Sequence, residues 1–132
     1  MKNNWPDYAL TTILPSHFHH CQCSSTKPLF IVSASNPYGI LMPSWFNKAA
    51  HWLLFLVLLL VTKAKPLPFI GKSFDGQWEE HCWGVLSAKK KAILFVARFF
   101  LQEAIFEIDR EKQKLIAANG IIKAVTTLSA KW

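Results

Sequence analysis

The residues that could do chemistry lie in two short tracts, and the first is rich in side chains that bind metals. The tract HFHHCQC contains His17, His19, His20, Cys21 and Cys23. Imidazole and thiolate groups are ligands that zinc and copper accept. A structural zinc site usually pairs two distant ligand couples at defined spacing, however, and the rest of this chain offers only the adjacent pair HC at 81–82. The pattern therefore favours an exposed polar tract, and we predict no metal and no cofactor.

The second tract, EEHC over residues 79–82, places acid, imidazole and thiol groups side by side. Adjacent side chains do not face one another on a helix or on a strand. The order of these residues alone therefore builds no Cys–His nucleophile. His51 is a further titratable residue, at the border of an apolar run, where it fits an interfacial position better than a catalytic one. The sequence thus predicts a non-catalytic protein with no catalytic residue.

The composition places the chain among small folded proteins with an uneven basic charge. Its 132 residues suit one small domain. A hydrophobic share of 52% with 14% aromatic residues excludes a wholly disordered chain. Three cysteines do not make a disulfide framework. The net charge of +7 would suit a nucleic acid or an anionic membrane surface as partner.

Nucleic acid is the less favoured of these two partners. Three consecutive lysines at 89–91 lie near Trp78 and Trp83, which could stack on bases. Acidic residues share that half of the chain, however, and the sequence contains no recognised nucleic-acid-binding motif. An apolar run in the other half gives the membrane interpretation priority.

The apolar run lies within a predicted helix over about 44–63, which begins after Pro43 and ends before Pro66. Residues 52–61, WLLFLVLLLV, contain no polar residue, so this helix must be buried on all sides in lipid or in protein. About 20 mostly apolar residues span a bilayer. Insertion of the central residues would gain about 3–5 kcal/mol. We therefore predict a single membrane span. A core helix of a soluble or peripheral protein is the alternative.

A second, amphipathic helix is predicted over about 85–118, within a helical C-terminal segment over 85–132. One face of it carries Ile93, Ala97, Phe100, Ala104 and Ile108 at helical spacing. Charged residues on the opposite face make a second span costly. We expect the apolar face to pack on a helical protein partner.

The remaining segments carry weak signals of regular structure. Prolines punctuate residues 1–43, so we predict an irregular N-terminal third, in which Leu29–Val32 reads as a short strand without an obvious partner. Residues 64–84 contain several prolines and glycines and are predicted to be a connector loop. The predicted fold class is mainly α. Because local signals in the first third disagree with one another, an unselected or lineage-restricted reading frame also fits them.

The functional prediction is a small single-pass membrane protein with an anchoring or interaction role. The lipid bilayer and a helical protein are its expected partners. More lysines follow the apolar run than precede it, which predicts a cytoplasmic C-terminus. Two alternatives remain: a soluble or peripheral α-helical binding module built around 52–61, and a metal-binding protein that uses the tract at 17–23.

Overall fold

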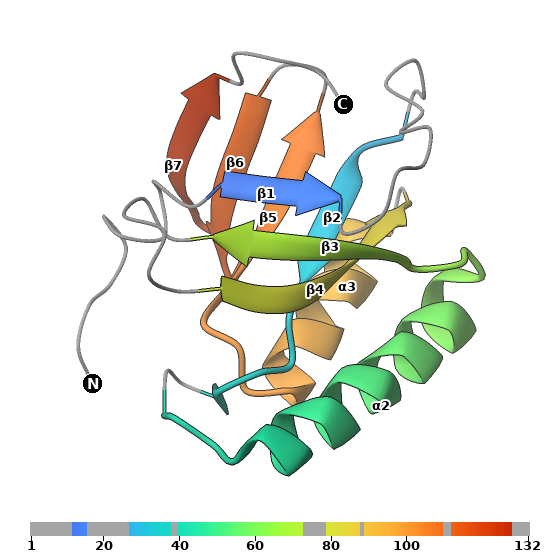
Figure 1. The fold of residues 1–132 in the computed structure, drawn as a ribbon. Coiled ribbons are helices and arrows are strands. Elements are labelled where there is room, and N and C mark those ends of the chain that lie inside the picture. The colour runs from blue at the N-terminus through green and yellow to red at the C-terminus, as the bar shows by residue number, and fades with distance from the viewer. Residues whose placement is uncertain are drawn as a thin grey trace.

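The structure is a computed structural model, which describes residues 12–15, 27–37, 40–72, 79–87, 89–109 and 112–127. These residues form a seven-stranded antiparallel sheet with two helices on one face (Figure 1). The strand order across the sheet is β1-β3-β4-β2-β5-β6-β7. The elements are β1 (Thr12–Pro15), β2 (Leu29–Val32), α2 (Ser44–Thr62), β3 (Leu67–Lys72), β4 (Glu79–Leu86), α3 (Lys90–Phe99), β5 (Ala104–Asp109), β6 (Lys112–Ala117) and β7 (Ile122–Thr127).

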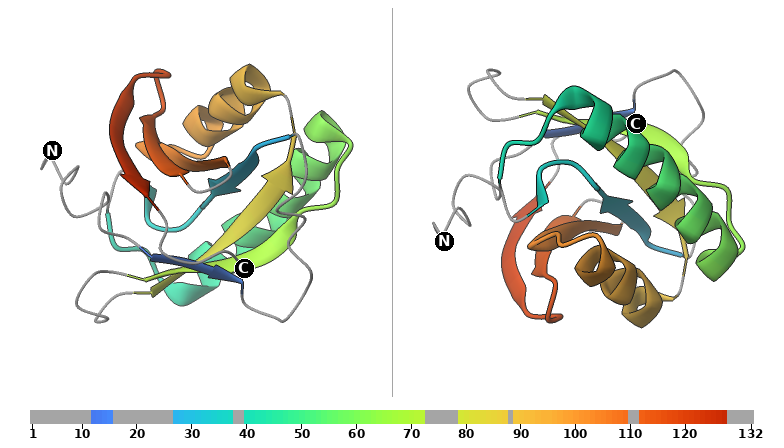
Figure 2. Two further views of the ribbon diagram at one scale, coloured as in Figure 1. Left: turned by 90° about the horizontal axis from the view of Figure 1, so that it is seen from above. Right: turned by 90° about the horizontal axis from the view of Figure 1, so that it is seen from below.

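The sheet is bent, so that its two halves cross one another. Figure 1 shows β1, β3 and β4 running across β5, β6 and β7, with β2 between the two groups. The views in Figure 2 show the helices outside this bend, on the convex face. Bending of this kind lets one sheet enclose side chains in the way that two crossed sheets do. The fold therefore has one hydrophobic core under the helices and a second one inside the bend.

Strand β2 lies at the centre of the sheet and contributes to both cores. Its four residues, LFIV, are all buried. Phe30 and Val32 pack under the helices, whereas Leu29 and Ile31 belong to the core inside the bend. A short unbroken apolar run is what a strand covered on both faces requires. The segment that the sequence predicted to be a lone strand is thus paired on both sides, with β4 and with β5.

Helix α2 agrees with the prediction of a helix over about 44–63. It begins after Pro43 and ends where Lys63 adopts a left-handed conformation with φ of 62°. The N–H of Lys63 donates to the carbonyl oxygen of Leu59 at 3.0 Å, which satisfies one of the last helical carbonyls. Its buried residues are Leu54, Leu58 and Thr62, all on one side of the helix. The opposite side of α2 is exposed.

The predicted membrane span is corrected by the way α2 packs. By length and composition alone, α2 is long and apolar enough to cross a membrane, but one helix of this kind is weak evidence for a span. Leu54 and Leu58 are fully buried in the core that α2 shares with the sheet and α3. A membrane position for α2 would carry adjacent strands of an open sheet into hydrocarbon, where unpaired backbone groups are costly. The findings therefore do not support a single-pass membrane protein.

The mainly α fold class is also wrong, chiefly because the predicted helix over 85–118 does not form. Helix α3 covers only Lys90–Phe99, and Leu101, two residues after its last residue, takes a left-handed φ of 57°. Strands β5 and β6 follow and pair with each other. The apolar residues of β5 alternate between the two faces of the sheet, with Ile105 under the helices and Ile108 inside the bend. The helical spacing seen in the sequence spans a helix and a strand.

The predicted connector over 64–84 and the irregular N-terminal third are corrected in the same way. Strands β3 and β4 occupy much of the connector and pair through six residues each. Strand β1, within the N-terminal third, pairs with β3 at the edge of the sheet. Near the C-terminus, β7 forms the opposite edge. These strands were missed because each is short and gains its stability from neighbours distant in sequence.

A methyl group added at Gly84 is expected to destabilise the core inside the bend. An ideal Cβ at this position on β4 would overlap the ring of Phe69 and approach Cδ1 of Ile31 to 3.1 Å. Overpacking of this kind typically costs about 1–3 kcal/mol. We therefore expect Gly84→Ala to lower the free energy of unfolding by about 2 kcal/mol, measured by urea denaturation. Phe69→Leu in the Gly84→Ala background should recover part of this loss, and strictly additive effects would contradict the overlap.

Candidate functional site

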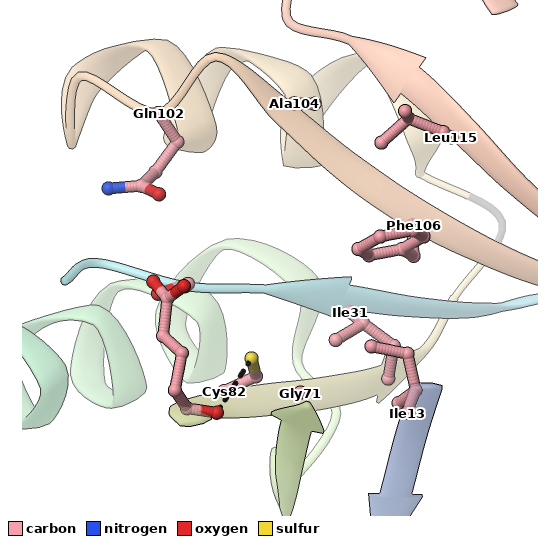
Figure 3. Close-up of a pocket in the computed structure, with 10 residues that line it drawn as sticks. Ile13, Ile31, Gly71, Cys82, Gln102, Ala104, Phe106 and Leu115 are labelled. Carbon is pink, nitrogen blue, oxygen red and sulfur yellow. Dashed lines mark hydrogen bonds between the residues drawn. The ribbon is translucent and has the colours of Figure 1, made fainter. Parts of the chain in front are cut away.

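The first candidate site is a cavity of about 60 Å³ on the concave face of the sheet (Figure 3). Both halves of the bent sheet contribute to its walls. Side chains that line it include Ile31, Glu80, Cys82, Gln102, Phe106 and Leu115. Apolar groups form most of this surface, and the polar groups are few. A concave apolar site with a small number of polar groups is the usual form of a small-molecule site.

Glu80 is the charged group of this cavity, and the pairing of β3 with β4 explains its position. Its cross-strand partner is Gly71, so no side chain lies directly opposite it on β3. The hydroxyl group of Ser33 donates a hydrogen bond to its Oε1 atom. Burial raises the pKa of the Glu80 carboxyl to about 7, although the hydrogen bond from Ser33 opposes this rise. Glu80 can therefore take either protonation state near neutral pH, which is typical of functional carboxyl groups.

Cys82 contributes an apolar wall and not a nucleophile. Its side chain is buried, and its thiol donates to the carbonyl oxygen of Glu80 at 3.5 Å. Burial, and next the charge of Glu80, raise the pKa of the Cys82 thiol well above its usual range. A thiol in this state is unreactive, because the thiolate is the nucleophilic form. The structure also places His81 on the opposite face, near His51, so the EEHC tract brings no imidazole to this thiol.

Gln102 lines the cavity from the segment between α3 and β5. Its amide nitrogen donates to the carbonyl oxygens of Ser35 at 3.1 Å and Phe100 at 3.3 Å. Figure 3 shows its side chain reaching toward the cavity, with the nitrogen turned away from the other labelled residues. Sequence reasoning missed Ser33 and Gln102, because nothing in their local context distinguishes them from ordinary loop residues.

His51 belongs to an aromatic cluster that joins α2 to β4 on the convex face. Its ring stacks on Trp83 with centroids 4.4 Å apart, and the Trp83 indole N–H donates to the His51 carbonyl oxygen at 2.7 Å. Burial, and next the neighbouring His81, lower the pKa of His51 to about 4. The imidazole is therefore neutral at physiological pH. These contacts give His51 a structural role in docking α2.

The tract at 17–23, which the sequence offered only as an alternative metal site, lies outside the described residues. Within the ranges that the structure describes, no group of three or more His, Cys, Asp or Glu residues could hold a metal ion.

The second candidate site is the outward surface of α2. A row of exposed residues runs along it at helical spacing, and we call this row the α2 stripe: Trp45, Ala49, Trp52, Leu53, Leu56 and Leu60. Trp45 is 71% exposed and Leu60 is 67% exposed. On neighbouring α3, Phe95 and Phe99 are exposed as well. Large apolar side chains gathered on one surface are characteristic of interaction sites.

The charged side chains carried by α2 and α3 themselves all have one sign. Neither α2 nor α3 contains an acidic residue. Exposed basic residues lie at both ends of α2 and on α3: Lys48, Lys63, Lys91 and Arg98. The surface is therefore apolar with a basic margin.

The residues predicted to contact a helical partner lie elsewhere. Ile93 and Ala97 have no exposed surface, and Phe100 and Ile108 are buried. Ala104 and Ile108 belong to β5, and Ala104 lines the cavity. The face predicted for a partner is thus occupied largely by the protein's own core, and the exposed apolar surface is on the outward sides of α2 and α3.

Fold and sites together define an α+β protein: one bent antiparallel sheet, two helices on its convex face, and a carboxyl-bearing cavity on its concave face. The chain belongs to the family described as "Protein of unknown function (DUF3293)", whose profile matches residues 32–105, more than half of the chain. No curated protein and no solved structure matches the chain. An unselected reading frame has no reason to match a family, so the family match argues against that interpretation of residues 32–105.

Proposed function

We propose that this protein is a non-catalytic interaction module that binds an amphipathic, acidic helix of a partner protein along the α2 stripe. The observation that carries the proposal is the exposure of this stripe, with Trp52 at 59% and Leu56 at 53%. Burial of such side chains in an interface removes apolar surface from water. Tryptophan is also enriched among the residues that dominate binding energy.

The spacing of the α2 stripe supports a helix as the partner. Positions 45, 49, 52 and 56 are separated by four, three and four residues. This is the spacing by which side chains of one helix fill the spaces between side chains of another. Ala49 is small, so a partner backbone can approach closely there. A helix that meets this row would present its own apolar residues at the same spacing.

The charge around the α2 stripe favours an acidic partner over a second copy of this chain. Lys48 and Lys63 are both exposed, near the two ends of α2. An antiparallel pair of α2 helices would bring Lys48 of one copy close to Lys63 of the other. Like charges at an interface suppress association, whereas an acidic margin on the partner would promote it.

We expect a peptide helix with apolar residues at the matching spacing and glutamate flanks to bind the purified protein. The same peptide with lysine flanks is the charge control. Isothermal titration calorimetry measures the affinity for the glutamate peptide. We expect this affinity to fall about thirtyfold in the double variant Leu56→Ser/Leu60→Ser, because the variant removes two apolar side chains of the α2 stripe from the interface. Val125→Ser is the matched control, because Val125 is 54% exposed but lies on β7.

Three results would contradict this proposal. Equal binding of both peptides would show that charge does not select the partner. Loss of binding in Val125→Ser as great as in the double variant would show that the α2 stripe is not the contact surface. Binding to anionic lipid vesicles, or self-association, without binding of the glutamate peptide would assign the stripe to a different occupant.

A further inference from the structure

The cavity on the concave face has a feature that the proposed interaction does not use, namely a largely buried carboxyl group without a cation. Among the described residues, the side chain of Glu80 has one hydrogen-bond partner, Ser33, and no ion pair. Buried carboxylates in proteins are normally paired with a cation, because an unpaired buried charge is costly. Without such a partner the carboxyl group is held partly neutral, with its pKa raised to about 7, and a bound cation would supply the missing counter-charge to its ionised form.

We propose that the cavity binds a small primary ammonium group, with the Glu80 carboxylate as its counter-ion. Hydrogen bonding at the site points to a ligand that donates. Three donors near the cavity are already used: the Ser33 hydroxyl donates to Glu80, the Cys82 thiol to a backbone carbonyl, and the Gln102 amide to two backbone carbonyls. Among the described residues, no hydrogen bond is made to the second oxygen of Glu80 or to the amide oxygen of Gln102, and both of these atoms are acceptors.

An ammonium group matches this set of acceptors in number and charge. It carries three N–H donors and one positive charge. Hydrogen bonds between a cation and a carboxylate are about twice as strong as neutral ones. A neutral ligand that only accepts hydrogen bonds would find no free donor among these three groups while Glu80 is ionised. The site therefore selects a cationic donor over an anionic or purely accepting ligand.

The size and lining of the cavity restrict the ligand further. A volume of about 60 Å³ is well below the roughly 150 Å³ that accommodates benzene. The ligand must therefore insert only a few non-hydrogen atoms. The apolar side chains of Ile31, Phe106 and Leu115 line the cavity, and they would contact the carbon chain next to the nitrogen. A short unbranched alkylammonium group fits these limits.

The space for the ammonium group next to Glu80 exists because the residue opposite it on β3 is a glycine. Gly71 lines the cavity and is the cross-strand partner of Glu80, and Ile13 on β1 is the next residue across the sheet. A larger residue at 71 would place its side chain beside the carboxyl group, on the same face of the sheet. The space next to Glu80 therefore follows from the register of three strands.

A free alkylamine and a lysine side chain of another protein share this chemistry. Both end in a primary ammonium group on an unbranched carbon chain. A lysine side chain can enter only if a peptide backbone also fits near the cavity mouth, whereas a free alkylamine has no backbone. Comparing n-butylammonium with Nα-acetyl-lysine methylamide therefore distinguishes the two sources. Binding of both would leave the cavity open to a lysine side chain, and binding of n-butylammonium alone would restrict it to free amines.

The test is a titration of the full chain with n-butylammonium, followed by amide NMR at Gly71, Cys82 and Gln102. We expect saturable shifts at these residues, with an affinity of about millimolar, which is what five non-hydrogen atoms can supply. 1-Butanol, which lacks the charge, and tetramethylammonium, which lacks N–H donors, should each bind at least about tenfold more weakly. Equal binding of either control compound would overturn the proposal.

The pH dependence gives a second readout on the wild-type chain. Among the described residues that line the cavity, the only other titratable one is Cys82, whose raised thiol pKa keeps it neutral. Because the pKa of Glu80 is about 7, raising the pH from 6 to 8 should increase the affinity for n-butylammonium about tenfold. A pH-independent affinity would contradict the assignment of Glu80 as counter-ion.

Two variants complete the test. Glu80→Gln keeps the shape of the side chain and removes the charge, so it should reduce the affinity at pH 8 by at least about tenfold and abolish the pH dependence. Ala104→Leu fills the cavity from β5 and leaves Glu80 unchanged. Retained binding in a folded Glu80→Gln protein would overturn the proposal. If that variant does not fold, the control compounds and the pH profile on the wild-type chain decide. The double variant Leu56→Ser/Leu60→Ser should bind n-butylammonium normally, which separates this site from the α2 stripe.

Discussion

Leu58→Ala is expected to lower the free energy of unfolding by about 2–5 kcal/mol. Leu58 lies on the inner side of α2 and has no exposed surface. It packs in the core under the helices, together with residues of β2, β4 and α3. Removal of its three terminal carbon atoms would leave a cavity that the surrounding strands cannot close without moving. Urea denaturation followed by circular dichroism measures the loss.

Leu60→Ala is the matched control for this prediction. Leu60 belongs to the same helix and the same apolar run, but it is 67% exposed on the α2 stripe. We expect a change within about 0.5 kcal/mol, because surface substitutions seldom cost more. Similar losses in both variants would contradict the packing of α2 described above. The contrast therefore distinguishes a helix with one buried side from a helix that is buried all round.

This contrast also shows what the sequence of α2 does and does not determine. The prolines at 43 and 66 and the continuous apolar run were sufficient to predict the helix and its ends. Which side of it is buried could not be predicted, because residues 52–61 are apolar in every direction. That choice is made by β4 and α3, which lie far along the chain. The membrane prediction followed from the assumption that an apolar surface on all sides must be covered on all sides.

The strands were harder to predict for a related reason. The residues of β5, AIFEID, place Ile105 and Glu107 on one face and Phe106 on the other. The spacing between these residues and the apolar residues of α3 matches a helical repeat, so the sequence predicted one amphipathic helix through both elements. Pairing with β2 and β6 decides between the two periods, and local sequence carries little information about such partners.

The cavity could be predicted least of all. Glu80 was visible only as one member of an adjacent set of acid, imidazole and thiol groups. Alternation along β4 sends Glu80 and His81 to opposite faces, and pairing with β2 brings Ser33 to the carboxyl group. The hydrogen bond joins residues that are 47 positions apart in the chain. Only the register of the strands creates this site.

Glu80→Gln is expected to stabilise the protein above pH 7 and to leave its stability nearly unchanged at pH 4. The pKa of Glu80 is raised from 4.5 to about 7 in the folded state. Below pH 4.5 the folded and unfolded chains both carry this proton. Between pH 4.5 and 7 only the folded chain retains it, so the stability of the wild type decreases as the pH rises through this window. Above pH 7, this pKa shift lowers the free energy of unfolding of the wild type by about 3 kcal/mol. The glutamine variant does not lose this stability, because its side chain carries no charge.

His51 titrates with the opposite sign in an overlapping window, so the prediction concerns the difference between two proteins. The pKa of His51 is lowered from 6.5 to about 4. The unfolded chain therefore binds this proton first, and the contribution of His51 to stability is lost as the pH falls from 6.5 to 4. Because wild type and Glu80→Gln share His51, subtraction of their unfolding free energies at each pH cancels its contribution. The difference should rise between pH 4.5 and 7 and remain constant above. A flat difference, or one that changes below pH 4.5, would mean that the carboxyl group is not held neutral by burial.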